Sequence, residues 1–313
     1  MTILKRATCA LLALALAMVF PTGCSDSNNN GVNAFFTFED DVQNTVILKE
    51  SPQRVAVLFS SLAQMWQLAG GEVSVTVGES VERGFADDGT PLVDSGAGKA
   101  INNELLVASA PDLVIGSADI AAHLQTAELM REVGIPVALF RIDDFEDYSH
   151  AMEILCGITQ RQDLYTANVT SPATQIESIK GSVPSGEQKR ILFIRCGSSY
   201  NATKAKTAKD NFVCAMLDRL GTYNIANNAP ILLDGLSIEE ILVQDPEYIF
   251  FSTMGNEEKA KEYMNGLLQT EVWQSLNAVK NGCYTYLPKE LFQYKPNHRW
   301  AEAYQYLFDQ LYE

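Results

Sequence analysis

The chain of 313 residues is poor in positive charge, in histidine and in paired cysteines. Lysine and arginine total 23 against 39 aspartates and glutamates, which gives a formal net charge of −16. Proteins that bind nucleic acid need a broad basic surface, so this charge argues against nucleic acid as a partner. The four cysteines beyond the N-terminal segment form no CxxC pair, so their spacing supports neither a zinc site nor redox chemistry. Each lies in an apolar segment and is expected to be a small buried hydrophobic side chain: Cys156, Cys196, Cys214 and Cys283.

Catalytic sequence motifs are also missing. Neither GxSxG nor HExxH occurs in the chain. The segment Gly96–Lys99 is similar to the end of a phosphate-binding loop, but Val93 stands where the first glycine belongs and Ala100 replaces the serine or threonine. None of the three histidines lies beside a plausible nucleophile, so an exported hydrolase is disfavoured and we expect no enzymatic activity.

The apolar run near the N-terminus, Ala7–Phe20, is too short for an ordinary membrane-spanning helix. Lys5 and Arg6 precede it, and Cys24 follows it at the start of a polar tract that has no means of packing. This arrangement resembles a bacterial lipoprotein signal, with 1–23 as signal peptide, Cys24 lipidated and 24–35 as a flexible tether. A plain secretory signal explains the tether less well. The mature chain is expected outside the cytoplasm, lipid-anchored to the cell membrane, in a periplasm or on the membrane's outer face.

The segment Asn102–Ser117, NNELLVASAPDLVIGS, predicts a short helix, a proline turn and a buried strand. Asn102 can cap the helix and Pro111 ends it. Leu113–Ile115 is a continuous apolar run, which is typical of a strand covered on both faces. The segment Ser237–Ser252, SIEEILVQDPEYIFFS, aligns with the first one without a gap. Two copies of one helix-strand unit indicate a chain of two similar lobes.

Buried strands alternate with helices on both sides of the chain's middle, which indicates parallel sheets in an α/β fold. A hairpin is expected at 36–49, and the predicted strands are 54–60, 73–77, 113–115, 137–142, 190–196 and 284–287. The predicted helices outside the two units are 62–69, 121–133, 211–220 and 298–312, and the Gly- and Asp-rich segment 78–99 is predicted to be a loop. The fold class is therefore α/β, with two Rossmann-like lobes.

A helical pattern without strand signals runs from Phe145 to about Ile179. We therefore divide the chain into an N-terminal lobe (36–144), a helical connector (145–183) and a C-terminal lobe (184–313), with one long connecting helix between the lobes. Pro172 lies inside that helix, where proline costs about 3 kcal/mol. Because Ser171-Pro172 is also a good helix start, a kink or break is expected near Thr170–Pro172.

Taken together, these segments resemble the substrate-binding proteins of bacterial ABC importers for ferric siderophores, haem and cobalamin. The matching pieces are the two helix-strand units and SPQRVAVLFSSLAQMWQLAGG, LCGITQR, LGTYNIANN and VWQSLNAVKNGCYTYLP, in that family's order and spacing over nearly the whole mature chain. The resemblance implies a ligand in the cleft between the lobes and little closure motion. It also implies docking onto a membrane permease driven by a cytoplasmic ATPase. We expect a monomer without a resident cofactor, whose ligand is an iron chelate, haem or cobalamin.

In this family one glutamate on each lobe reaches arginines of the permease, and the matching positions here are Glu104 and Glu239. The alternative is that both are first-turn acids favoured by the helix dipole, worth about 0.3–1 kcal/mol each. Ser237 and Glu240 have the spacing of a capping box, in which Glu240 makes the capping bond and Glu239 is not needed for it. We therefore favour docking.

Ligands of open α/β sheets bind beyond the carboxyl ends of the strands, so the loops there supply the candidate ligand-binding residues. These are Phe59, Ser60, Ser61, Arg83, Lys99, Ser117, Arg195, Tyr200, Lys204, Lys206 and Arg299. Arg195 is followed by three lysines before the first acid at Asp210, and on so acidic a chain this favours an anionic ligand. A solvated lysine face is an open alternative for the three lysines. Arg195 directly follows a buried apolar run and carries more weight.

Three other functions compete with this one. Tyr200 or His298 could ligate haem iron, although one tyrosine among 12 is weak evidence. Importers of bare Zn²⁺ or Mn²⁺ cluster histidines and carboxylates, but His123 and His150 lie on predicted helices and His298 in the other lobe, which disfavours that class. A lipid-anchored adhesin would explain the tether but not the two matching units.

Overall fold

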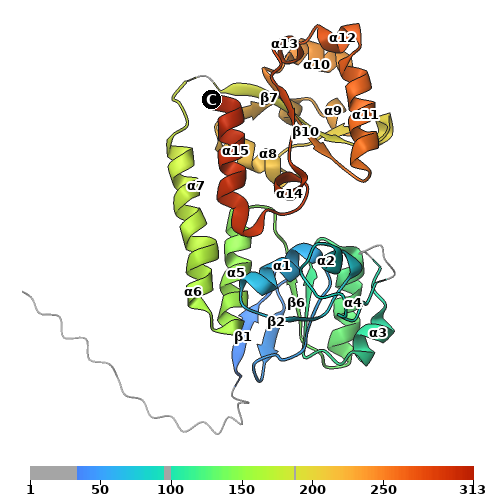
Figure 1. Cartoon of the computed structure of the whole chain (residues 1–313), viewed down its shortest axis with the longest axis vertical. Helices are drawn as coiled ribbons and strands as arrows, with labels where there is room; N and C mark the ends of the chain where they lie inside the picture. The colour runs from blue at the N-terminus through green and yellow to red at the C-terminus, as the bar shows by residue number, and fades with distance from the viewer. Residues whose placement is uncertain (1–33, 95–99, 187) are drawn as a thin grey trace, which may run out of the picture. The chain divides into compact units, whose positions relative to one another are not determined.

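The computed structural model describes residues 34–94, 100–186 and 188–313. The predicted signal segment, Cys24 with most of the tether, and Lys99 lie outside these ranges. Within them the chain folds into the predicted two α/β lobes with helices beside them (Figure 1).

The first lobe is built on a parallel sheet with the strand order β4-β3-β5-β6. Its strands are β3 (Val55–Val57), β4 (Val73–Val75), β5 (Leu113–Ser117) and β6 (Val137–Phe140). Its helices are α1 (Ser60–Leu68), α2 (Gly78–Glu82), α3 (Asn103–Ala108) and α4 (Ala121–Glu132). The predicted hairpin is formed by β1 (Phe36–Glu39) and β2 (Thr45–Leu48). Every residue of β3, β5 and β6 is buried, as expected for apolar strands covered on both faces.

One part of the first lobe was predicted wrongly. The segment 78–99 was expected to be a loop, but it begins with α2. The first amide of this helix, Gly78 N–H, donates to Asp94 Oδ1 at 3.0 Å. The capping side chain therefore lies 16 residues further along the chain, so the sequence around Gly78 does not indicate that a helix begins there.

The second lobe is built on a sheet with the order β11-β10-β7-β8, and β9 also pairs with β7. Its strands are β7 (Lys189–Cys196), β8 (Lys204–Ala205), β9 (Thr222–Asn224), β10 (Tyr248–Thr253) and β11 (Tyr284–Tyr286). The helices are α8 (Phe212–Arg219), α9 (Ile231–Asp234), α10 (Ile238–Gln244), α11 (Glu257–Leu268), α12 (Glu271–Gln274), α13 (Asn277–Lys280), α14 (Lys289–Phe292) and α15 (Trp300–Tyr312). Short 3₁₀ turns are η2 (Tyr200–Ala202), η3 (Ile225–Asn228) and η4 (Asn297–Arg299). Strands β7, β10 and β11 and helices α8, α10 and α15 were predicted, whereas β8, β9, α9 and α11–α14 were not.

The two helix-strand units are confirmed as structural equivalents. The Asn102 side chain accepts from Leu105 N–H at the start of α3, and Ser237 Oγ accepts from Glu240 N–H at the start of α10. In each unit the acidic residue after the proline then accepts a hydrogen bond from a backbone N–H at the start of the neighbouring strand. Asp112 accepts from Arg54 N–H at 2.9 Å, and Glu247 accepts from Arg190 N–H at 2.9 Å.

The connector consists of two helical segments. The first is α5 (Phe145–Thr159), and the second is continuous through α6 (Gln162–Tyr165), the π-helical η1 (Thr166–Thr170) and α7 (Ser171–Gly181). The chain reverses at Gln160, whose φ of 59° is left-handed. Figure 1 shows the second segment turning back beside α5 and then running beside α15. The long connecting helix is therefore Gln162–Gly181, and the prediction that it begins at Phe145 is wrong.

Pro172 does not break this helix. It follows the π-helical turn directly, and the backbone stays helical from Thr170 through Ser171. Without an N–H, Pro172 cannot satisfy the carbonyl of Asn168 four residues earlier. Tyr148 Oη of α5 donates to that carbonyl instead, at 3.2 Å. Burial raises the pKa of Tyr148, so its hydroxyl stays protonated as a donor.

One of the apolar core clusters joins both lobes and the connector. It joins first-lobe strand residues such as Ile115 to second-lobe residues such as Phe193. Trp300 at the start of α15 is fully buried in it. Its ring lies edge-on to Phe145, with ring centroids 6.2 Å apart, and to Phe212, with centroids 5.7 Å apart. Cys156, Cys196 and Cys214 are buried as predicted, whereas Cys283 is only partly covered.

We predict that Tyr148→Phe lowers the free energy of unfolding by about 1–3 kcal/mol, because the Asn168 carbonyl loses its donor. In a Pro172→Ala background, the introduced alanine supplies a backbone N–H. Tyr148→Phe should then lower the free energy of unfolding by clearly less. Urea denaturation of the four proteins measures this double-mutant cycle. An equal cost in both backgrounds would show that the hydroxyl does not replace the missing proline donor.

Candidate functional site

The carboxyl ends of β3 and β5 carry four of the predicted residues: Phe59, Ser60, Ser61 and Ser117. Ser60 and Ser61 open α1 and are buried. Ser60 Oγ donates to Glu79 Oε2 at 2.5 Å and accepts from Arg83 Nη1 at 2.9 Å. These contacts make Ser60 a positioning residue for Arg83.

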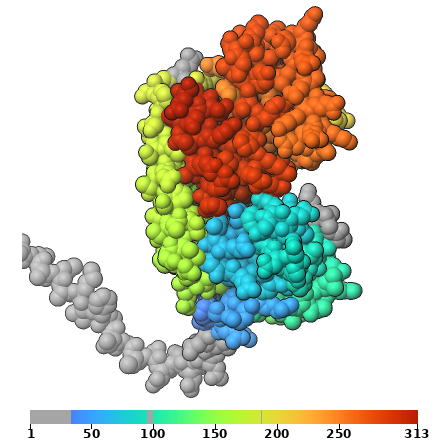
Figure 2. All heavy atoms as spheres, in the orientation of Figure 1, coloured from blue at the N-terminus to red at the C-terminus, as the bar shows by residue number. Residues whose placement is uncertain are grey.

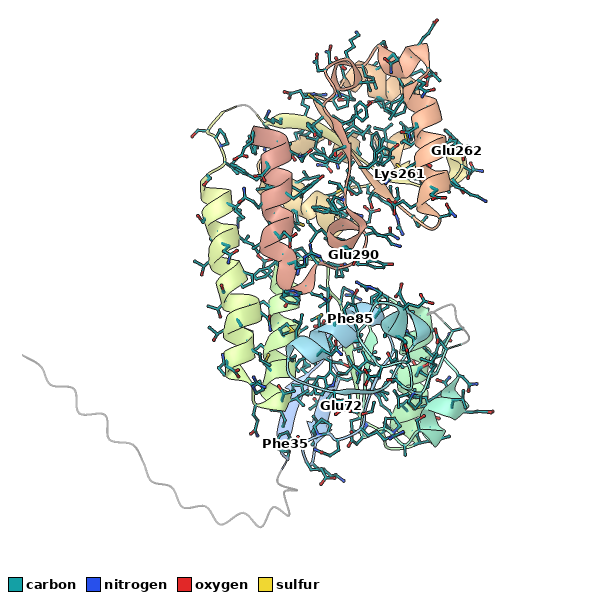
Figure 3. All side chains as sticks on the ribbon, in the orientation of Figure 1. Phe35, Glu72, Phe85, Lys261, Glu262 and Glu290 are labelled. Carbon is teal, nitrogen blue, oxygen red and sulfur yellow. The ribbon has the colours of Figure 1, made fainter. Side chains whose placement is uncertain are left out.

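Arg83 joins the two lobes. Its guanidinium carbon lies 4.8 Å from the Phe85 ring centroid in the first lobe and 3.7 Å from the Tyr294 ring centroid in the second. Its Nη2 lies 3.8 Å from Glu290 Oε2, and its side chain is 11% exposed. Burial lowers the pKa of Arg83, while Glu290, Tyr294 and Glu79 act in the opposite direction. Figure 3 shows Phe85 and Glu290 on the facing sides of the two lobes, and Figure 2 shows an indentation of the surface between the lobes.

A second positive group lies on the second-lobe sheet. Arg195 of β7 and Lys204 of β8 are directly opposite in the antiparallel ladder. Like charges in that position repel, so an anion between them would relieve the repulsion. Within residues 34–94, 100–186 and 188–313, neither side chain pairs with a carboxylate.

Two other predicted cations are already paired. Lys206 Nζ lies 2.7 Å from Asp210 Oδ2, and Arg299 makes two bonds of 2.7 Å to Glu302. Tyr200 of η2 is 55% exposed. Its hydroxyl packs against Gly235. A β-carbon on residue 235 would lie only 2.7 Å from that hydroxyl oxygen, so a larger residue would not fit without a shift. Lys206 and Arg299 therefore have carboxylate partners, whereas Arg195 and Lys204 have none within the described ranges.

A cavity of about 220 Å³ lies at the first-lobe strand ends, under the turn after α14. Phe59, Ser61 and Ser117 line it, together with mainly apolar residues and Lys295 of the second lobe. Lys295 was not predicted from the sequence. It lies four residues before the predicted Arg299, but nothing in the sequence of that segment distinguishes Lys295 from its neighbours.

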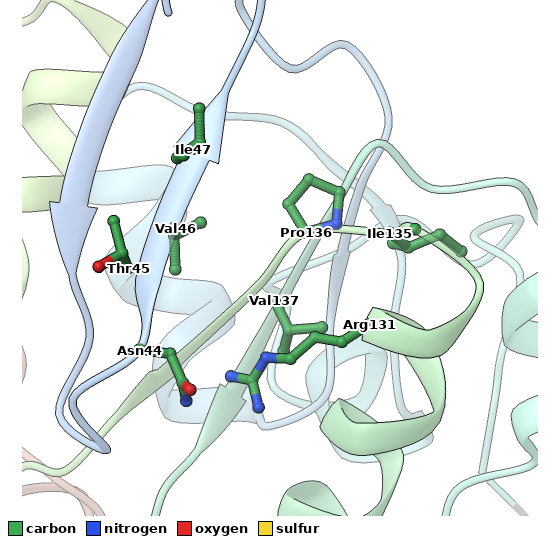
Figure 4. A pocket seen from close by; sticks show the side chains of 9 residues that line it. Asn44, Thr45, Val46, Ile47, Arg131, Ile135, Pro136 and Val137 are labelled. Atoms are coloured by element: carbon green, nitrogen blue, oxygen red, sulfur yellow. The ribbon is translucent and has the colours of Figure 1, made fainter.

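A pocket of about 280 Å³ lies between β2 and the start of β6, lined by residues such as Ile47, Arg131 and Pro136 (Figure 4). Arg131 Nη2 is already bound there to the buried Asp40, at 3.3 Å. This pocket faces the amino ends of the strands, where ligands of open α/β sheets do not bind.

Comparison with known proteins agrees with this geometry. The profile of the family described as periplasmic binding protein matches residues 55–291. This chain belongs to the periplasmic binding protein family. The family predicted from the sequence is therefore confirmed.

Individual relatives of this periplasmic binding protein are distant. The YhfQ protein of Bacillus subtilis (strain 168), to which the name ABC transporter substrate-binding lipoprotein has been assigned, is 21% identical over 88% of this chain and 89% of its own. Staphylococcus aureus SirA, solved with staphyloferrin B, has a TM-score of 0.67 at 15% identity over 88% of this chain and 97% of its own. The haem-binding RhuT of Roseiflexus sp. RS-1 has a TM-score of 0.66 at 15% identity over 83% of this chain and 98% of its own.

The candidate docking residues of this periplasmic binding protein are both exposed, at matching places on α3 and α10. The predicted capping box is only half formed. Glu240 N–H donates to Ser237 Oγ, but the Glu240 carboxylate accepts from Gln244 Nε2 at 2.8 Å. Ser237 Oγ donates to Glu239 Oε2 at 3.2 Å. Glu239 therefore makes a side-chain bond at this helix start, and its carboxylate remains on the surface.

In the described part of the chain, no helix has the length and apolarity to cross a membrane. The same residues contain no group of three or more histidines, cysteines or acids arranged to hold a metal ion. His123 is fully buried beneath β5, and its Nδ1 accepts from Ser117 N–H at 3.0 Å. It therefore positions Ser117 at the edge of the cavity.

Burial lowers the pKa of His123 from 6.5 to about 4. Between these values the unfolded chain binds a proton at this residue and the folded protein does not, so stability falls as the pH drops from about 6.5 to 4. We predict that His123→Asn, which keeps an acceptor for Ser117 N–H, removes about 1–3 kcal/mol of that pH dependence. Urea denaturation of both proteins at pH 7 and pH 4.5 measures it, because the other titrating groups are common to both. The same stability difference at both pH values would contradict the assignment.

Proposed function

We propose that this periplasmic binding protein captures an iron–siderophore complex, or a related chelate, between its lobes. It then delivers the ligand to an ABC permease with a cytoplasmic ATPase. The observation that carries the proposal is Arg83, a cation held at the interlobe surface by aromatic rings from both lobes. The name assigned to YhfQ and the ligand of SirA support the importer role and the ligand class.

The division into lobes at 36–144 and 184–313, with 145–183 as connector, is part of this proposal. So are a lipid anchor at Cys24, an extracytoplasmic monomer and a role without catalysis. The lipoprotein name of the Bacillus subtilis relative supports the anchor.

The cations of the site favour an anionic ligand. Arg83, Arg195 and Lys204 are three cations on strand ends or the loops beside them, in a chain of net charge −16. A cluster of one sign in an acidic surface concentrates the opposite charge locally. Phe59 and Tyr200 would add aromatic contact, and Ser117 a hydroxyl. Arg299 and Lys206, bound to their own carboxylates, would contribute less.

We predict that Arg195→Gln with Lys204→Gln weakens binding of a ferric siderophore about tenfold or more, a loss of roughly 1.4 kcal/mol. Lys206→Gln is the matched control, because Lys206 lies on the same segment but is paired with Asp210. Quenching of the buried Trp66, Trp273 and Trp300 by absorbing ligands measures affinity across a panel of ferric siderophores, haemin and cobalamin. Unchanged affinity in the double variant would remove both residues from the site. Saturation by haemin alone would assign the ligand to haem, with Tyr200 or His298 as the residues to test.

Docking is tested separately from binding. We predict that Glu104→Ala with Glu239→Ala lowers uptake by about tenfold or more while ligand affinity is retained, because the charged contacts to the permease are lost. Glu128→Ala with Glu262→Ala is the control, with one exposed glutamate changed on another helix of each lobe. Normal transport by the first pair would show that these glutamates are first-turn acids only.

A further inference from the structure

We propose that the cavity beneath Lys295 is a subsite for one aromatic limb of the ligand, and that the limb carries an anionic oxygen that the lysine binds. The proposal rests on the proposed function, since the rest of the ligand would occupy the interlobe cleft beside Arg83.

The walls of the cavity are mainly apolar, and its polar lining residues are Ser61, Ser117, Asp119 and Lys295. The apolar part is formed by the side chains of Phe59, Leu62, Met65, Ile120, Phe140 and Ile142. These residues come from the segment after β3, from α1, from the segment after β5, and from the last residue of β6 and the segment after it, so the cavity lies where the first-lobe strands end. Apolar walls at a site otherwise rich in charge select an apolar group of the ligand.

The volume sets the size of that group. An apolar cavity of roughly 150 Å³ is known to take up benzene. The cavity here measures about 220 Å³, which is room for one substituted six-membered ring. A macrocycle such as a tetrapyrrole is too large, so the cavity receives a limb of the ligand and not the whole.

Lys295 and Asp119 are the charged residues that line the cavity, and Lys295 is the cation. Its side chain is 24% exposed, and its Nζ lies 4.9 Å from the Phe212 ring centroid. The nearest paired carboxylate oxygen, Asp143 Oδ1, is 4.0 Å away, beyond hydrogen-bond distance. Burial lowers the pKa of Lys295, whereas Asp143, Asp119, Asp147 and Asp144 act in the opposite direction.

The other acids near Lys295 are committed elsewhere. Asp119 binds Arg141 at 2.7 Å, and Asp144 binds Arg219 at 2.8 Å. Asp147 Oδ2 accepts from Asp143 N–H at 2.8 Å. In the described ranges of the chain, the ammonium group therefore donates no hydrogen bond. A carboxylate or phenolate oxygen on the bound ring would accept one, and charge-assisted bonds of this kind are strong in a poorly hydrated site.

The cavity itself is tested with benzoate as the probe, on mature protein labelled with ¹³C at the methionine methyl groups. Met65 lines the cavity, whereas Met130 and Met264 lie in other core clusters and serve as internal references. We expect millimolar benzoate to shift the Met65 signal alone, and cyclohexylamine, of similar size and opposite charge, to leave it unchanged. A missing Met65 response, or equal responses to both compounds, would overturn the subsite.

Two variants test the contributions of charge and space. Lys295→Gln should weaken benzoate binding about tenfold, whereas Lys180→Gln, on α7 and paired with Glu177, should not. Ile120→Trp should fill the cavity and block benzoate with the thermal melt unchanged. This variant keeps the proposal testable if Lys295→Gln fails to fold. Benzoate binding that survives either change would overturn the assignment.

Ferric complexes separate this proposal from the proposed function. Lys295→Gln should weaken binding of ferric tris(2,3-dihydroxybenzoate) and leave a ferric hydroxamate unaffected. If Lys295→Gln lowered the affinity for both complexes equally, or for neither, the subsite would be overturned even though the protein binds iron chelates. Absence of binding by any iron chelate, with the Met65 response to benzoate intact, would instead reject the proposed function.

Discussion

The burial of Trp300 is the constraint on which the site depends. The ring lies between Phe145 and Phe212, at the first residue of α15, in a core that contains strand residues of both lobes. Asn297, just before it, donates through Nδ2 to Ser61 O at 3.0 Å and to Gln64 Oε1 at 2.7 Å. Swinging the lobes apart would expose this core and break those bonds. An opening motion of the lobes is therefore costly in buried apolar area and hydrogen bonds.

The sequence predicted those parts of the fold whose causes are local. Apolar runs such as Val114–Ile115 predict buried strands, and the capping residues Asn102 and Ser237 predict helix starts. The reversal at Gln160 has no such signal, because the left-handed residue there is not a glycine. Lys295 could not be identified either. Its place in the site comes from Phe212 and Asp143, which lie about 80 and 150 residues away and reach it only through the fold.

The chain is acidic as a whole, whereas the candidate binding residues include several cations. A net charge of −16 would repel an anionic chelate from most of the surface. At an ionic strength of 0.15 M such repulsion is screened over about 8 Å, whereas a partly buried cation is screened much less. Arg83 and Lys295 are both mainly buried and lie at the first-lobe strand ends, so the attraction acts at the site while the repulsion is weakened in solution. Selectivity for an anion is thus compatible with an acidic protein.

The two lobes are similar where they support the proposed docking and different where they bind. Asp112 and Glu247 hold the adjacent strands in the same way, and this fixes α3 and α10 with Glu104 and Glu239 at matching positions. A partner with two similar halves could engage both. The candidate ligand-binding residues share no such match, since Arg83 and its serines belong to the first lobe and the Arg195–Lys204 pair to the second. An asymmetric cleft can fix the orientation of an asymmetric chelate.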